Sequence, residues 1–336
     1  MKNLSTTYLG IDIESPIVIG ASNLSKSLDN IKAAGENGAG AIVYKSLFEE
    51  QVHLDAIQLQ DELMEFNDRN AEMTTIFPSI SHAGPEIHLN ELRKTKEASD
   101  IPIIASLNAI YKETWVEYAE LIEQTGVDAI ELNFYAVPRL KSITGNDIVE
   151  KVLSSVQAVK EKVKIPISVK LSPFYANPLN VIDELDMAGV NGVVLFNRFF
   201  QPDIDIETEQ HFSPFNLSAQ HDDHLALRFA GLLYGEINAD IIANTGIYTG
   251  EDVVKMILAG ANSVQVVSTL YKNKIPYLKT MLEEISGWMD EKGYTSLSDF
   301  RGKLSRNKVS NPYLYKRAQY IDMLLNPEGI VKQYQV

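Results

Sequence analysis

Short apolar runs recur along the chain, and each is continuous rather than alternating between apolar and polar residues. A continuous run of Val, Ile and Leu is typical of a parallel strand that is buried on both faces. The stretches between the runs have helical spacing, as in Ile148, Val152, Val156 and Val159. The runs predict strands at Ile17–Ala21, Ala41–Lys45, Ile101–Leu107, Ala129–Asn133, Ile167–Leu171, Gly192–Asn197, Asp240–Thr245 and Ser263–Ser268.

Eight strand–helix units in series favour a (β/α)₈ barrel, the TIM barrel fold. A doubly wound open sheet is the alternative, but the units run on with no reversal or domain break. We therefore expect one barrel domain over residues 1–293 and a C-terminal tail, 294–336, that packs on the barrel or on a partner subunit. Two long connections, Ser46–Glu86 after the second strand and Arg198–Asp223 after the sixth, should lie at the rim where barrel enzymes build their active sites.

Charge and composition limit the classes of partner and binding site that we expect for this barrel. The formal net charge of −15 repels phosphate backbones and anionic membranes, so we expect no nucleic-acid partner and no membrane partner. The chain has no cysteine, which excludes disulfides, thiolate metal ligands and cysteine nucleophiles. His221 and His224 are interpreted as the polar start of a helix, and no metal site is expected. No run is apolar enough to span a bilayer and no signal-peptide pattern is present, so we expect a cytoplasmic protein.

The predicted strands end in polar residues, although their interiors are apolar. In a barrel these ends converge on one mouth, so together they indicate a polar ligand. A lysine in such a mouth is costly unless it is paired or faces an anion. For Lys170 the alternative to a ligand contact is an ion pair with a carboxylate such as Glu131. The polar strand ends are Ser22, Asn23, Lys45, Ser46, Ser106, Asn108, Asn133, Lys170, Asn197, Asn244, Thr245 and Ser268.

The connection after the seventh strand has the pattern of a phosphate cradle. The strand ends in Asn-Thr-Gly, and a helix is predicted after Thr249 with Asp252 three residues on, as in a capping box. The loops after the last two strands of these barrels commonly supply backbone N–H groups to a phosphate. Residues 267–269 would provide the second half of that cradle.

On these residues the chain resembles the dihydroorotate dehydrogenase family, from about Leu4 to Ser305. The resemblance implies an FMN-binding barrel that oxidises a small-molecule substrate, dihydroorotate, in pyrimidine biosynthesis. A hydride would pass to flavin N5 while a loop residue removes a proton. The sequence FNRFFQPDID is most similar to a branch described as dihydroorotate dehydrogenase-like. The other matching stretches are GAS near Ala21, YKS at Lys45, ELN at Asn133, SVKLSPF at Lys170, LFN at Asn197, IIANTGIYTGEDVVKMILAGA and KGYTSLSDFRGKL.

The resemblance also implies roles for particular residues. Lys170 would lie at the flavin N1–C2 edge, where its charge stabilises the reduced flavin, and Asn133 and Asn197 would face the substrate. A homodimer is implied as well. A soluble electron acceptor is expected, because no cysteine is present to hold an iron–sulfur cluster and no membrane-binding extension of the quinone-linked kind is seen. The flavin ring and ribityl would contact Ala21, Ser22, Lys45, Ser46, Asn108, Asn133 and Lys170, and the phosphate would contact Thr245, Gly246, Val267 and Ser268.

The loop after the fourth strand departs from the family pattern. The position of the family's Cys or Ser base falls on Ala136, which cannot accept a proton, and a substrate asparagine falls on Pro138. Tyr135 is a candidate base in its place, although an ordinary tyrosine pKa of ~10 would have to be lowered. Three readings therefore stay open: oxidation of dihydroorotate or another small cyclic or unsaturated substrate, a non-catalytic flavin-binding barrel, and a lyase or aldolase that uses Lys170 as a Schiff-base amine.

Overall fold

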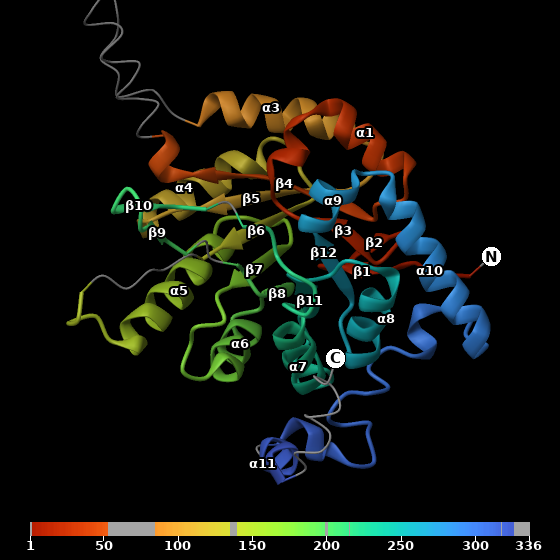
Figure 1. The fold of residues 1–336 in the computed structure, drawn as a ribbon. Coiled ribbons are helices and arrows are strands. Elements are labelled where there is room, and N and C mark those ends of the chain that lie inside the picture. Colours follow the sequence, from red (N-terminus) through yellow and green to blue (C-terminus); the bar gives the residue numbers. More distant parts are fainter. Residues whose placement is uncertain are drawn as a thin grey trace, which may run out of the picture.

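The computed structural model describes residues 2–52, 85–134, 140–198, 201–214, 216–316 and 318–325. Within these ranges eight parallel strands close a barrel, each beside the next barrel strand along the chain (Figure 1). The last strand pairs with the first, with Val264 opposite Ile17, which confirms the predicted fold. The barrel strands are β3 (Ile17–Ile19), β4 (Ala41–Phe48), β5 (Ile103–Asn108), β6 (Ala129–Asn133), β7 (Ile167–Leu171), β8 (Gly192–Leu195), β11 (Asp240–Asn244) and β12 (Ser263–Val266).

Helices surround the barrel and cover the outer faces of its strands (Figure 1). α8 begins with the predicted capping box: Thr249 Oγ1 accepts a hydrogen bond from Asp252 N at 3.2 Å, and the Asp252 carboxylate accepts one from Thr249 N at 3.1 Å. The helices around the barrel are α1 (Leu28–Glu36), α3 (Glu86–Glu97), α4 (Lys112–Glu123), α5 (Gly145–Lys160), α6 (Pro178–Met187), α7 (His224–Leu233), α8 (Gly250–Ala259), α9 (Ser268–Asn273) and α10 (Tyr277–Lys292).

An N-terminal hairpin closes the bottom of the barrel, at the amino ends of its strands. Its strands are β1 (Thr6–Tyr8) and β2 (Ile11–Ile13), and Tyr8 and Leu9 at its tip are fully buried. A Cβ atom on Gly192, where β8 begins, would lie 2.3 Å from Leu9 Cδ2, so a glycine is needed there for the hairpin to fit. The sequence analysis missed this hairpin because its strands are three residues long and lie outside the repeated strand–helix pattern.

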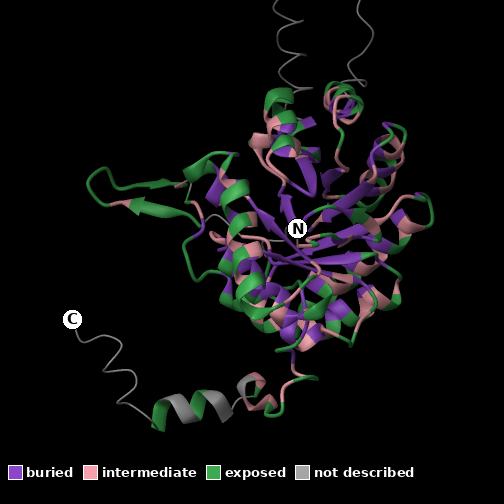
Figure 2. Cartoon of the chain, turned by 90° about the vertical axis from the view of Figure 1, so that its right-hand side faces the viewer, coloured by how far each residue is buried: buried purple, intermediate pink, exposed green. Residues whose placement is uncertain are grey.

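The rim after the sixth barrel strand carries a second hairpin, β9 (Asp203–Asp205) and β10 (Gln210–Phe212). It projects from the body of the barrel, and its residues are largely exposed (Figure 2). The other long rim connection, after the second barrel strand, lies outside the described residues from 53 to 84.

The segment after α10 returns to the base of the barrel before it leaves the body. Leu297 and Phe300 are buried, and Asn3 forms a β-bridge with Ser296. Gly302 N donates to Ile257 O at 2.9 Å, which fixes the segment to α8. Beyond it, α11 (Ala318–Leu325) projects away from the barrel (Figure 2). Within the described part of the chain, no helix has the length and apolar character needed to cross a membrane.

Candidate active site

A pocket of about 460 Å³ opens at the carboxyl ends of the barrel strands. Nearly all the polar strand ends meet there, as do Ala21, Gly246 and Val267, the remaining residues that the resemblance implied. Tyr135, Ala136 and Pro138 lie outside the described residues. The lining residues named from the sequence are Ala21, Ser22, Asn23, Lys45, Ser46, Asn108, Asn133, Lys170, Asn197, Asn244, Thr245, Gly246, Val267 and Ser268.

Sequence reasoning missed several residues of this pocket, and Gln265 is the most informative of them. It stands in the middle of the apolar run Ser263–Val267, where a lone amide was a signal of an interior polar contact. Arg198 was missed too, although it directly follows Asn197 at a strand end. The other unanticipated lining residues are Phe48, Asn216, Leu217, Ser218, Ile247, Val266 and Tyr271.

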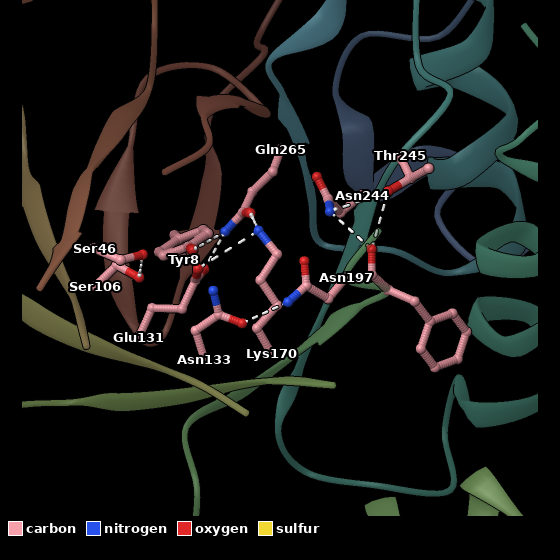
Figure 3. A network of polar contacts seen from close by, with 11 residues as sticks. Tyr8, Ser46, Ser106, Glu131, Asn133, Lys170, Asn197, Asn244, Thr245 and Gln265 are labelled. Carbon is pink, nitrogen blue, oxygen red and sulfur yellow. Dashed lines mark hydrogen bonds and ion pairs between the residues drawn. The ribbon is translucent and has the colours of Figure 1, made fainter. Parts of the chain in front are cut away.

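Lys170 is held at the floor of the pocket by a buried polar network (Figure 3). Its Nζ donates a hydrogen bond of 2.9 Å to Gln265 Oε1 and lies 3.6 Å from Glu131 Oε1. The Lys170 side chain is 7% exposed and that of Glu131 is 0% exposed, so both charges lie in a low-dielectric interior where pairing is needed. Lys170 therefore forms the ion pair with Glu131 that was the alternative to a ligand contact, and it also lines the pocket, where a ligand can reach it.

The same network continues downward to the N-terminal hairpin. Gln265 Nε2 donates to Glu131 Oε2 and, at 2.9 Å, to the hydroxyl of Tyr8 (Figure 3). Burial raises the pKa of the Tyr8 phenol well above its usual value, and the nearby charge of Glu131 raises it further. Tyr8 therefore stays neutral, and the carboxylate of Glu131 is left as the negative partner of Lys170.

Amide side chains form the middle of the pocket. Asn197 Nδ2 donates a 2.7 Å hydrogen bond to Asn133 Oδ1, which joins β6 to the end of β8. Asn244 Nδ2 donates to Phe196 O at 2.9 Å, and Thr245 Oγ1 donates to the same carbonyl oxygen at 3.0 Å. Thr245 has a φ of 77°, in the left-handed region that is uncommon for threonine. The hydrogen bond to Phe196 O helps to hold Thr245 in that conformation.

The predicted phosphate cradle lies at one end of the pocket. Gly246 has a φ of 77°, and a Cβ atom on it would lie 2.4 Å from Asp223 N, so its missing side chain lets the loop before α7 close over the turn. Ser218 N donates to Ser268 Oγ at 3.0 Å, and Tyr248 OH donates to Ser218 O. These bonds bring residues 216–218 over the cradle.

The opposite side of the pocket is formed by β3 and β4. Ser46 Oγ and Ser106 Oγ are 2.7 Å apart, within hydrogen-bonding distance, whereas the buried Ser22 Oγ has no hydrogen-bond partner among the described residues. Lys45 lines this side and lies near His88 of α3. Burial lowers the pKa of His88 to about 4, and the charge of Lys45 lowers it as well. The unpartnered Ser22 hydroxyl and the Lys45 side chain both line the pocket and are polar groups that a ligand could contact.

The described lining is positively charged, in contrast to the protein as a whole. It includes Lys45, Lys170 and Arg198, and no Asp or Glu among the described residues lines the pocket. A cationic cleft in a chain of net charge −15 favours anionic ligands at this one place.

A separate histidine cluster lies at the start of α7, which begins at His224 as the sequence suggested. Ligating atoms of His221, Asp223 and His224 lie within 4.8 Å of one another. Burial raises the pKa of Asp223, and the neighbouring charge of Asp252 raises it further. Both imidazoles are exposed, and the expectation that no metal binds there stays a prediction.

A sequence profile of the family named dihydroorotate dehydrogenase matches residues 78–289, well over half of the chain. The catalytic subunit of dihydroorotate dehydrogenase B (NAD(+)) from Thermoplasma acidophilum is 26% identical over 310 residues, which cover 90% of this chain and 99% of the relative. A chloroplastic dihydropyrimidine dehydrogenase (NADP(+)) from Arabidopsis thaliana is 27% identical, with 94% of this chain and 80% of the relative covered. A putative dihydroorotate dehydrogenase A (fumarate) from Aeropyrum pernix is 32% identical over 64% of this chain and 71% of the relative. The chain belongs to the dihydroorotate dehydrogenase family of oxidoreductases.

Proposed function

We propose that this protein is an FMN-dependent oxidoreductase that oxidises a carbon–carbon single bond of a small cyclic substrate, dihydroorotate or a close relative of it. The observation that carries the proposal is the polar pocket in which Lys170, Asn133 and Asn197 converge opposite a phosphate-type cradle at Gly246. The family supports the reaction class, since the relatives are named as dihydroorotate and dihydropyrimidine dehydrogenases.

The residues of the pocket fit FMN in size and in chemistry. A volume of about 460 Å³ is within the range of cofactor sites. Ser22 Oγ is buried and unpartnered among the described residues, so it is available to a ligand. Gly246 lines the pocket beside Thr245, where the backbone N–H groups of the turn can bind a phosphate. The ring and ribityl would be held by Ala21, Ser22, Lys45, Ser46, Asn108, Asn133 and Lys170, and the phosphate by Thr245, Gly246, Val267 and Ser268.

Bound FMN would supply the hydride acceptor of the reaction. The chain itself provides charge and orientation. Gln265 and Glu131 hold Lys170 Nζ in a fixed place, so a positive charge is fixed at the floor of the pocket. The bonded pair Asn133 and Asn197 presents amide groups that can orient a substrate with its own amides. Tyr135 is the proposed base, because Ala136 cannot remove a proton.

The structure favours the redox reading over a Schiff-base lyase. A Schiff-base lysine must present a neutral amine to a carbonyl. Lys170 Nζ is instead engaged by Gln265 and by the buried carboxylate of Glu131. The pocket also has more polar groups than a single carbonyl substrate requires. A soluble electron acceptor and a homodimer complete the proposal.

The test is reduction of the bound flavin. The purified protein should show the visible absorption spectrum of an oxidised flavin, and adding dihydroorotate without oxygen should bleach it. Tyr135→Phe should slow bleaching by about 10²–10⁴-fold, the usual effect of losing a general base. Tyr320→Phe, an exposed tyrosine in α11, is the matched control and should bleach at the wild-type rate.

Each result bears on a different part of the proposal. A protein that takes up no FMN would refute the flavin assignment. Bound flavin that dihydroorotate leaves oxidised would refute dihydroorotate as the substrate, and if no related cyclic donor bleached it, the non-catalytic flavin barrel would be correct. Equal bleaching by the wild type and by Tyr135→Phe would exclude Tyr135 as the base.

A further inference from the structure

Arg198 is a cation of the pocket that neither the cofactor assignment nor the strand-end pattern uses. It directly follows Asn197, which is bonded to Asn133 in the middle of the pocket. It also lines a second cavity of about 340 Å³ beside the first, together with Phe174 and Gln201. Arg198 therefore lies between the Asn133–Asn197 pair, which is proposed to bind the substrate, and the second cavity.

The guanidinium of Arg198 is held in a defined direction. Its Nη1 lies 3.0 Å from Asp222 Oδ2, and the same oxygen accepts a hydrogen bond from Ala219 N at 2.8 Å. This contact uses one of the five N–H donors of a guanidinium. The structure shows no other hydrogen bond from Arg198 to a described residue, and its side chain is 35% exposed. Donors therefore remain available on the same planar group.

We propose that Arg198 binds a carboxylate of the substrate, so that the enzyme selects a small ring compound that carries a carboxylate over its neutral counterpart. This inference rests on the proposed function, because it takes the pocket to be the substrate site. A guanidinium fork matches the two oxygens of a carboxylate and binds them with charge-assisted hydrogen bonds. The contact with Asp222 fixes the orientation of the fork in advance, which reduces the entropy lost on binding.

The charge of the lining supports an anionic substrate. A protein of net charge −15 repels carboxylates, so an anionic substrate needs a local excess of positive charge. The described lining provides it with three cations and no carboxylate. The charge of Lys170 is offset by Glu131, and Lys45 lies on the opposite wall, with Ser46. Lys170 also lies beside Asn133, but its Nζ is engaged by both Gln265 and Glu131. Arg198, which follows Asn197 in the chain, pairs with Asp222 through one Nη and keeps other N–H donors for a ligand.

The position of Arg198 favours the substrate over the cofactor phosphate as its ligand. The second cavity that it lines shares Asn197, Asn244 and Thr245 with the first pocket, and of the four proposed phosphate contacts it includes Thr245 but not Gly246, Val267 or Ser268. Arg198 thus lies on the side of the pocket where Asn197 is, between the two cavities.

The test compares two probes that differ by one carboxylate, orotate and uracil, on the FMN-loaded protein. Their dissociation constants are measured from the change in the flavin absorption spectrum and by calorimetry. The wild type should bind orotate at least about 10-fold more tightly than uracil, and added salt should weaken orotate binding alone. Arg198→Gln should weaken orotate binding by about 10- to 100-fold and leave uracil binding unchanged. Arg198→Lys should bind orotate with an affinity between those of the wild type and Arg198→Gln, because lysine keeps the positive charge and lacks the guanidinium fork.

Arg306→Gln is the matched control. Arg306 forms an ion pair of 2.8 Å with Glu236, has a similar side-chain exposure of 36%, and lies outside the pocket. Its removal should leave both dissociation constants unchanged. Three results would overturn the proposal. Arg198→Gln could bind orotate as tightly as the wild type does, or it could lose as much affinity for uracil as for orotate. The wild type could also bind uracil as tightly as orotate.

Two further measurements separate this proposal from its alternatives. If Arg198→Gln loses affinity for FMN but not for riboflavin, the guanidinium binds the phosphate and the proposal is wrong. The FMN content of the wild type is measured first, since a protein that takes up no flavin refutes the proposed function. Calorimetry with orotate and uracil on that flavin-free protein still decides whether Arg198 binds a carboxylate.

Discussion

Glu131 Oε1 lies 3.6 Å from Lys170 Nζ inside the barrel, and Gln265 bonds to both side chains. Both residues come from the wall of the barrel, one from β6 and the other from β7, and Asn133 of β6 pairs in register with Lys170 of β7. Glu131 itself pairs with Ser168, so the two charged residues are diagonal neighbours on adjacent strands, and Gln265 of β12 crosses the interior and bonds to both. This arrangement places a charged residue at the floor of the pocket without an unpaired charge in the core.

Neutralising both members of this pair should destabilise the protein by less than the sum of the two single losses. Removing one partner leaves the other as an uncompensated buried charge, which typically costs about 3–5 kcal/mol. Glu131→Gln and Lys170→Met should each lower the free energy of unfolding in urea by roughly that amount. The double variant should lose less than the sum, with a coupling of about 1–3 kcal/mol. Additive losses, measured on flavin-free protein, would mean that the pair is not coupled.

Lys170→Met should also lower the reduction potential of bound FMN. A positive charge beside the flavin favours the reduced, anionic form, and removing it withdraws that stabilisation. We expect a fall of about 30–60 mV, equivalent to about 1.4–2.8 kcal/mol for two electrons. The potential is measured by dye-coupled reduction under anaerobic conditions. Lys160→Met, on α5 outside the barrel, serves as the control, and an equal potential in the two variants would remove Lys170 from the flavin site.

Gly246→Ala should impair cofactor binding. The added Cβ would lie 2.4 Å from Asp223 N at a φ of 77°, so the turn or the loop over the cradle must shift. FMN affinity, measured by fluorescence titration of the flavin-free protein, should fall by at least about 10-fold, since a shift costing 1.4 kcal/mol has that effect. Gly287→Ala in α10, where nothing lies within 4 Å of the new Cβ, should keep its FMN affinity and gain about 0.5–1 kcal/mol of stability. Unchanged binding by Gly246→Ala would place the phosphate elsewhere.

His88 should make the protein less stable in acid. Burial lowers its folded-state pKa to about 4, against about 6.5 for an ordinary histidine. Below pH 6.5 the unfolded chain binds a proton that the folded protein refuses, so the free energy of unfolding falls as the pH drops from 6.5 to 4. The loss from this residue is at most about 3 kcal/mol. His88→Gln should flatten the stability profile over this window, whereas the exposed His211→Gln should leave the slope as in the wild type.

The barrel could be predicted from the sequence because its strands leave a repeated local signal. Ala129–Asn133 and Ile167–Leu171 were predicted with the bounds that the structure shows, since continuous apolar runs flanked by helical spacing have few other interpretations. Some observed strands end earlier than predicted because the polar terminal residue leaves the extended conformation. The strand predicted to end at Thr245 ends at Asn244, and Thr245 has a positive φ. Polar strand ends were enough to locate the pocket, since a closed parallel barrel brings every such end to one mouth.

Contacts between distant parts of the chain could not be predicted in this way. Nothing local to Tyr8 indicates that its hydroxyl meets Gln265, and the two are 257 residues apart. The pairing of Arg198 with Asp222 likewise depends on how the rim loop folds back, which hydrophobic periodicity does not determine. The sequence did carry two signals of the interior network: Glu131, named as a carboxylate that could pair with Lys170, and Gln265, a lone amide within an apolar strand.

The hairpin that closes the barrel also sets when folding can finish. Asn3 bridges to Ser296, Thr6 Oγ1 donates to Asn262 O and Tyr8 bonds to Gln265. The hairpin therefore depends on partners that are synthesised more than 250 residues later. Contacts of such sequence separation form late and slow a fold. In a nascent chain the hairpin must therefore wait without these partners, and the bottom of the barrel closes only after translation has passed residue 296.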